Sequence, residues 1–260
     1  ALHVPEAGVV DFREVCSRLH EELAGRGLDY RYGEAIESAV HEDGTVRVES
    51  TGREISAGRL LGCAGLFAHE VAARCGFEQR ARIVPFRGEY WILSEDAARR
   101  VRALVYPVPD PELPFLGVHL TRDVHGTVDA GPNAVLAFAR EGYSRRDVDP
   151  GHLASLAAWP GAWRLAWRQR RYVGGEMLRS MSRHQTARKL RRMLPALRDE
   201  DLLSGGSGVR ALLVDPDGRL VDEFRFAGDG PLLHVLNAPS PAATASVAIG
   251  EHVADRLLAS

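Results

Sequence analysis

The sequence predicts a mixed α+β and α/β fold with two structural parts. The spacing of apolar and turn residues in 1–80 predicts a helix, a hairpin and a strand–glycine–helix unit, which is typical of an α/β domain. From residue 83 the pattern changes to consecutive strands, which favours an antiparallel sheet. A last strand and helix follow residue 230. We therefore expect one domain from 1–80 and 206–260, and a second from 81–205.

Composition limits the classes of protein to consider. The 260 residues are 45% hydrophobic and 26% charged, with a net charge of −2, which is typical of a globular chain and argues against general nucleic-acid binding. Three cysteines, Cys16, Cys63 and Cys75, lack metal-ligand spacing, so we expect no metal site and a reducing, cytoplasmic compartment. The longest uncharged run, 230–250, contains three prolines and is not expected to span a membrane.

The first 80 residues contain clear start and stop signals. Asp11 and Glu14 form a capping-box pattern before a helix that Gly25 and Gly27 end. Strands are expected over 35–40 and 45–50, joined by the hairpin turn Asp43-Gly44. A buried strand over 59–63 then leads through a glycine into a helix over 66–74.

The central region is expected to contain strands over 83–93, 103–108, 116–122 and 127–130, with a tight turn at His125-Gly126. Residues 153–194 are predicted to be mainly helical, with breaks near Pro160-Gly161 and Gly174-Gly175. Strands over 208–214 and 220–226 flank the turn Asp217-Gly218, and a strand over 232–236 precedes the final helix, which reaches Leu258.

The start of the final helix has the chemistry of an anion site. Ser240 is a good N-cap and Pro241 fits the first helical position. The small residues 242–245 would leave the first N–H groups open to a flat ligand. The helix dipole favours a ring that gains negative charge, and a reduced flavin is such a ring. An ordinary capped helix explains the same pattern equally well.

Several segments, in one order along the whole chain, resemble the L-2-hydroxyglutarate oxidase/dehydrogenase family, part of the larger D-amino-acid-oxidase-like group. They lie at residues 8–11, 63–65, 85–90, 106–111, 114–122, 131–135, 208–211 and 233–246. The resemblance implies FAD as cofactor, oxidation of the small dicarboxylate L-2-hydroxyglutarate to 2-oxoglutarate, and oxygen or a membrane quinone as electron acceptor.

One feature of that family is missing. No G-x-G-x-x-G follows a strand and opens a helix, although this turn holds the ADP half of FAD in the family. We therefore expect an N-terminally truncated sequence with weak FAD retention and little activity. A chain completed by a separate N-terminal partner, acting as a non-catalytic module, is the alternative from another functional class.

Three residues are the candidates for substrate chemistry. Arg210, in a Gly-x-Arg element, would bind a substrate carboxylate through its planar guanidinium, although Leu212 stands where the family has glutamine. His119 would accept the hydroxyl proton, with His234 as the rival base. Tyr90 would bind the second carboxylate. Tyr106 is a further candidate for that role, ahead of Arg87 and Arg122, and Asn133 is interpreted as a turn residue.

The candidate flavin contacts follow from the resemblance. They are Ala64, Gly65, Asn237, Ala238, Pro239, Ser240, Pro241, Ala242 and Thr244. The Gly-x-Arg element and the flavin helix are shared with amine and amino-acid oxidases, which are the alternative enzyme class. The blocks at 106–109 and 237–241 argue against that alternative.

Positive charge is concentrated between residues 164 and 192. Ten arginine and lysine residues lie there with a single acidic residue, Glu176. Trp159, Trp163 and Trp167 precede or overlap this run at a spacing of four, which places them along one helical face. We expect these tryptophans to pack inward on a solvated helix. Peripheral contact with an anionic membrane on the inner face is the alternative.

Overall fold

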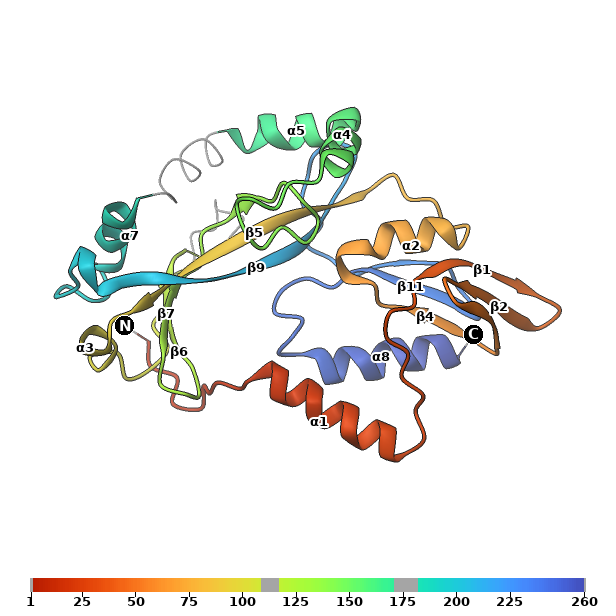
Figure 1. The fold of residues 1–260 in the computed structure, drawn as a ribbon, viewed down its shortest axis with the longest axis horizontal. Helices are drawn as coiled ribbons and strands as arrows, with labels where there is room; N and C mark the ends of the chain where they lie inside the picture. Colours follow the sequence, from red (N-terminus) through yellow and green to blue (C-terminus); the bar gives the residue numbers. More distant parts are fainter. Residues whose placement is uncertain (1, 109–116, 171–181, 260) are drawn as a thin grey trace.

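A long antiparallel pair of strands organises the molecule. The computed structural model describes residues 2–108, 117–170 and 182–259. In it, β5 (Arg82–Leu93) pairs with β9 (Leu202–Val214) from Arg82↔Val214 to Leu93↔Leu202. Figure 1 shows this pair crossing the middle of the molecule. The short strands β6 (His119–Arg122), β7 (Val128–Gly131) and β8 (Val135–Leu136) complete an antiparallel sheet, as predicted for this region.

A second sheet contains a parallel pair. β4 (Leu60–Gly62) runs parallel to β11 (Leu232–Asn237), and β10 (Arg225–Ala227) pairs antiparallel with the other edge of β11. A 3-10 turn (η1, Gly65–Phe67) and helix α2 (Ala68–Arg74) come after β4, as the strand–glycine–helix pattern predicted. The predicted burial of the strand is wrong, because β4 lies at the edge of its sheet and Leu61 is exposed. Gly65 has φ +52, the left-handed conformation that glycine adopts without a steric penalty.

The N-terminal elements form around the predicted turns. α1 (Phe12–Gly25) begins after Asp11, whose carboxylate accepts from the Arg13 N–H. β1 (Ile36–Glu42) and β2 (Thr45–Ser50) form the predicted hairpin, with positive φ at Asp43 and Gly44. A third strand, β3 (Arg53–Ala57), pairs with β2 and was not predicted. None of the residues in α1 is buried.

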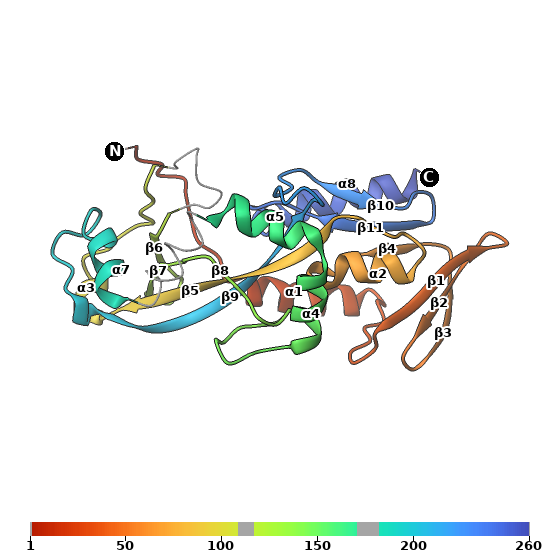
Figure 2. The same cartoon turned by 90° about the horizontal axis from the view of Figure 1, so that it is seen from above.

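Helices cover one long margin of the β5–β9 pair. α4 (Pro150–Ala158) and α5 (Pro160–Arg168) lie along it, and Figure 1 places both at the top of the molecule. Trp159 and Leu165 pack there against Val84, Phe86 and Val214. α7 (Arg183–Leu190) and α3 (Glu95–Ala98) cover the far end, beside β6 and β7 in Figure 2. The predicted break at 174–175 lies outside the described residues.

Four further local predictions are wrong. Residues 103–108 contribute only an isolated bridge, Val105↔Leu120, because a single residue pair makes the backbone hydrogen bonds there. Of 220–226, only the end joins β10, and Leu220 bridges Val214. The final helix, α8 (Ser246–Leu258), starts six residues after Ser240, so Ser240 is not its N-cap and Pro241 is not its first residue. The inward tryptophans are the fourth case: Trp159 is buried, but Trp163 and Trp167 are exposed.

The reason for the later helix start is local hydrogen bonding. The Ala245 N–H donates to the Pro241 carbonyl, and the Ser246 N–H donates to the Ala243 carbonyl. These residues therefore form consecutive turns, and no side chain caps α8.

Among the described residues, no helix has the length and apolar character needed to cross a bilayer.

Candidate functional site

Arg210, Tyr90 and His119 come together on the antiparallel sheet although they are far apart in sequence. Arg210 lies on β9 opposite Phe86, four residues before Tyr90 on β5. The Arg210 guanidinium is close enough to act on the pKa of Tyr90 through its charge and as a hydrogen-bond donor, and its charge also lowers the pKa of His119. The three predicted substrate residues therefore form one electrostatic cluster.

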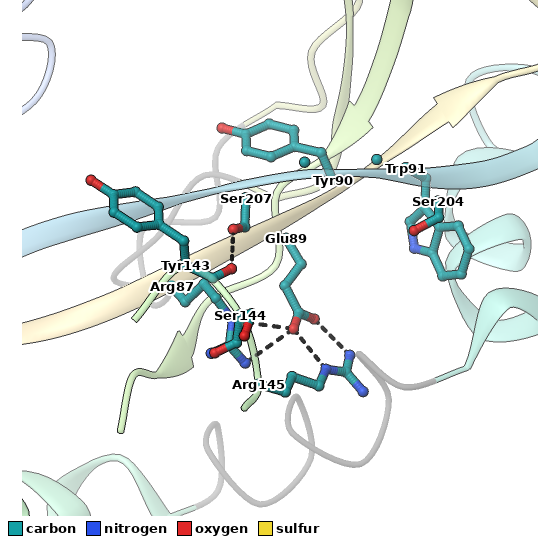
Figure 3. A pocket seen from close by; sticks show the side chains of 11 residues that line it. Arg87, Glu89, Tyr90, Trp91, Tyr143, Ser144, Arg145, Ser204 and Ser207 are labelled. Atoms are coloured by element: carbon teal, nitrogen blue, oxygen red, sulfur yellow. Dashed lines mark hydrogen bonds and ion pairs between the residues drawn. The ribbon is translucent and has the colours of Figure 1, made fainter. Parts of the chain in front are cut away.

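Tyr90 sits at an irregularity that directs its side chain. The strand register passes from Glu89↔Ser207 to Trp91↔Ser204, so Tyr90 lies in a β-bulge. Gly205 makes this bulge possible, since a Cβ there would lie 2.4 Å from the Tyr90 carbonyl oxygen. Figure 3 shows Tyr90 on one side of the strand pair and Glu89 on the other. Burial raises the pKa of Tyr90, so its hydroxyl stays protonated and remains a donor at neutral pH.

His119 is held in a defined orientation by two neighbours. Its Nδ1 lies 3.0 Å from the Gly117 carbonyl oxygen, which assigns the proton to Nδ1 and leaves Nε2 as the acceptor. The Tyr106 ring stacks on the imidazole at a centroid distance of 4.5 Å. Burial is the main cause that lowers the pKa of His119, and the Arg210 charge lowers it further. A neutral imidazole that carries its proton on Nδ1 can accept a second proton on Nε2 at neutral pH.

The rival base has a different environment. His234 lies on β11, only 1% exposed, with its ring packed against Gly62 of β4 and tilted against Phe77. Burial lowers its pKa. Its Nε2 has no hydrogen-bond partner among the described residues. His234 therefore has the surroundings of a neutral packing residue in the parallel sheet.

A charge network on the opposite side of β5 was not predicted as a unit. Arg145 makes two hydrogen bonds of 2.8 Å to the Glu89 carboxylate, and Arg87 donates to the same group at 3.1 Å (Figure 3). Asn133 donates to Glu89 at 2.9 Å and accepts from its backbone N–H. Burial alone would raise the pKa of Glu89, but these partners lower it to about 2. Together with Tyr143 and Ser207, the network borders a cavity of about 390 Å³.

Two secondary candidates, Arg87 and Arg122, have structural partners. The buried Arg87 binds the Ser144 carbonyl at 2.9 Å as well as Glu89, so its donors hold the 142–145 loop. Arg122 donates to the carbonyls of Ala98 and Val101, behind α3. Both arginines thus have structural partners. A sequence signal for the network exists in the Arg87–Glu89 spacing, which places the two side chains on one strand face.

The predicted cofactor residues lie at the carboxyl ends of the parallel strands β4 and β11. β4 ends at Gly62 and β11 at Asn237, and their carboxyl ends open on the same side because the strands are parallel. Ala64 and Leu236 pack in one cluster with Ala211, the neighbour of Arg210. Pro239 and Ser240 follow β11 directly, and most of 238–244 is exposed. This edge offers small side chains and a glycine turn to a flat group.

Asn237 has a structural role in the same place. Its Nδ2 donates to the carbonyls of Val221 and Glu223, both at 2.8 Å, which uses both of its N–H groups. A cavity of about 600 Å³ borders β4, α2, Ala64 and His234. Among the described residues, β4 has no strand on the side away from β11. No group of three or more acidic, histidine or cysteine side chains in the described part could hold a metal ion.

Comparison with known proteins gives one consistent result. The family model described as FAD dependent oxidoreductase matches residues 1–256. L-2-hydroxyglutarate dehydrogenase from Indibacter alkaliphilus is 40% identical over 98% of this chain and 64% of its own length. The Escherichia coli K12 protein of that name is 39% identical over 98% of this chain and 61% of its own. The chain thus spans less than two thirds of these curated relatives.

Solved structures show the same fold at low sequence identity. The reduced, FAD-bound L-α-glycerophosphate oxidase from Mycoplasma pneumoniae matches with a TM-score of 0.59 at 16% identity, covering 86% of this chain and 50% of that one. Glycine oxidase from Geobacillus kaustophilus matches with a TM-score of 0.55 at 15% identity, covering 94% and 53%.

Proposed function

Because the chain belongs to the family of FAD-dependent oxidoreductases, we propose that it oxidises L-2-hydroxyglutarate to 2-oxoglutarate as part of a longer flavoprotein. The observation that carries this proposal is the contact between Arg210 and Tyr90 beside a neutral His119. The cluster supplies a cation for a carboxylate and a base for a hydroxyl group. A 2-hydroxy dicarboxylate needs both.

The roles follow from the chemistry of each group. The Arg210 guanidinium binds one substrate carboxylate through paired N–H donors. The Tyr90 hydroxyl, kept protonated by burial, donates to the second carboxylate. His119 takes the C2 hydroxyl proton on Nε2, because Nδ1–H is committed to Gly117. Bound FAD would supply the acceptor for the hydride from C2.

The cofactor residues fit this role through their position and size. We propose that Ala64, Gly65, residues 237–242 and Thr244 contact the flavin at the carboxyl ends of β4 and β11. Small side chains and the turn at Gly65 let backbone N–H groups approach a ring that gains electrons. The predicted two-domain division, 1–80 with 206–260 and 81–205, belongs to the same proposal. Its second boundary, between residues 205 and 206, lies within β9.

Electron transfer out of the flavin completes the cycle. We propose oxygen or a membrane quinone as the acceptor, with peripheral contact to the inner face of the membrane in the quinone case. Hydrogen peroxide formation in air, compared with anaerobic reduction of a soluble quinone, distinguishes the two acceptors.

The test is anaerobic bleaching of the flavin in the full-length, FAD-loaded protein. L-2-hydroxyglutarate should bleach the visible flavin absorption, whereas the D enantiomer and glycine should not. A His119→Gln variant should bleach about 10²–10⁴-fold more slowly, because it lacks the base. His125→Gln, at an exposed histidine, is the matched control. Bleaching by glycine with none by L-2-hydroxyglutarate would replace this proposal with an amino-acid oxidase.

A further inference from the structure

The outer face of α5 carries two large aromatic side chains in solvent. Trp163 is 65% exposed and Trp167 is 69% exposed, whereas Gly161 and Leu165 on the same helix are buried. Each tryptophan follows a buried position by two residues, which rotates it to the opposite side of the helix. An exposed pair of tryptophans on one helix face is uncommon and marks an interaction surface.

The protein holds α5 firmly in this orientation. Leu165 packs in the cluster formed by Val84, Phe86 and Trp159. The turn at Gly218 fits tightly under the helix, since a Cβ there would lie 2.3 Å from the Leu165 backbone nitrogen. The Trp163 Nε1–H donates to the Ala157 carbonyl at 2.7 Å, so this indole already has its polar partner. What it offers outward is the apolar ring.

Positive charge surrounds the two indoles. Arg164, Arg168 and Arg170 border a surface hollow of about 670 Å³ together with the tryptophans, and Asp217 is the one acidic residue among the described residues that line it. Arg164 and Arg168 each donate to a carbonyl of the adjacent turn, at 2.7 and 2.9 Å. The Arg170 guanidinium lies 4.3 Å from the Trp167 ring centroid. Each guanidinium has five N–H donors, so anion binding remains open to all three.

We propose that this α5 surface, formed by Trp163, Arg164, Trp167, Arg168 and Arg170, docks on an anionic lipid membrane. Tryptophan rings prefer the depth of lipid headgroups, and arginines beside them bind lipid phosphates. Three cations around one hollow complement a negatively charged surface. The inference rests on the peripheral membrane contact proposed above and assigns it to one helix. Figure 1 shows α5 on the opposite margin of the molecule from α1 and α8.

Vesicle flotation tests the assignment on the full-length, FAD-loaded protein. The two probes are vesicles of phosphatidylcholine alone and vesicles that also contain about a third of phosphatidylglycerol. The protein should float with the anionic vesicles and much less with the neutral ones. Trp163→Ala with Trp167→Ala should reduce binding at least tenfold, and Arg164→Gln with Arg168→Gln should reduce it severalfold. The matched control combines Tyr32→Ala and Arg99→Gln, an exposed aromatic and an exposed arginine elsewhere.

The outcomes separate this inference from the proposed reaction. Flavin bleaching by L-2-hydroxyglutarate, measured on the same variants without lipid, should match the unmodified protein. Unchanged flotation of the tryptophan variant would overturn the role of α5, and equal binding to neutral and anionic vesicles would overturn the lipid specificity. Absence of flotation, or a dimer that the tryptophan substitutions dissolve, would also overturn the proposal. None of these outcomes depends on turnover.

Discussion

At the scale of single residues, Arg210 controls the two groups beside it. Its charge is one cause of the lowered pKa of His119, after burial, and its hydrogen bond acts on Tyr90. A base must be neutral to accept a proton, so activity should rise as pH increases through the pKa of His119. That pKa lies below the ordinary histidine value.

Arg210→Met should raise the pKa of His119 partway toward its ordinary value, because burial remains while the nearby charge is lost. The acid limb of the activity profile should move to higher pH, and substrate affinity should fall. NMR titration of the His119 ring measures the first effect without turnover. Arg210→Lys keeps the charge, so it should keep the pKa while still weakening carboxylate binding. An unchanged His119 pKa in Arg210→Met would contradict the assigned coupling.

The Glu89 network ties the 142–145 loop to the central strand pair. Glu89→Gln would leave the buried Arg87 without its anionic partner and should cost about 3 kcal/mol of unfolding free energy. Glu95→Gln, at a carboxylate on the surface, should cost little. Denaturant unfolding of both variants measures the difference, and equal costs would show that the network adds no stability.

The same carboxylate predicts a pH dependence. The pKa of Glu89 is lowered to about 2 in the folded protein, so its stabilisation is complete above the unfolded value of about 4.5 and is lost as pH falls toward 2. The unmodified protein should therefore lose more stability over this window than Glu89→Gln. Parallel slopes for the two proteins would contradict the assignment.

At the scale of elements, the bulge in the β5–β9 pair aims Tyr90. Gly205→Ala should displace this segment and cost about 1–3 kcal/mol, because the new Cβ would lie 2.4 Å from the Tyr90 carbonyl oxygen. Gly206→Ala is a matched control, since nothing lies within 4 Å of a Cβ there. Thermal unfolding and substrate affinity should both change in the first variant alone. Equal behaviour of the two alanine variants would mean that the bulge is not needed.

At the scale of the whole molecule, the parallel pair is short, and in the described part of the chain β4 has no strand on its other side. β4 has three residues, and a cavity of about 600 Å³ lies beside it. Parallel strands are normally covered on both faces and continued by further strands. The chain also spans 64% of the Indibacter relative, and its sequence contains no Gly-rich dinucleotide turn. These facts support the prediction that this chain binds FAD weakly.

The 260-residue chain alone should accordingly retain little FAD. Gel filtration after incubation with FAD, followed by the visible spectrum, measures retention. Weak retention with a folded circular dichroism spectrum is the expected result. Stoichiometric FAD in the protein fraction would show that the site at the carboxyl ends of β4 and β11 is sufficient to bind FAD without a dinucleotide turn.

The sequence alone determined the elements whose signals are local. The Asp11 cap, the Asp43-Gly44 turn and the strand–glycine–helix unit at 60–74 depend on neighbouring residues, and each formed as predicted. Short blocks along the chain predicted an FAD-dependent oxidoreductase, and the family model of that description, matched over residues 1–256, confirmed it.

Only the tertiary structure decided the features that depend on contacts distant in sequence. Pairing of β5 with β9 brought the Arg210 side chain within reach of Tyr90, and Glu89 binds Asn133 and Arg145, which are more than 40 residues away. Burial of Trp159 with exposure of Trp163 and Trp167 depended on which face of α5 meets the sheet. A spacing of four fixes a common helix face, but a neighbouring element determines whether that face is covered. For the same reason, turns held by residues 241–246 delayed the start of α8, which Ser240 and Pro241 had suggested earlier.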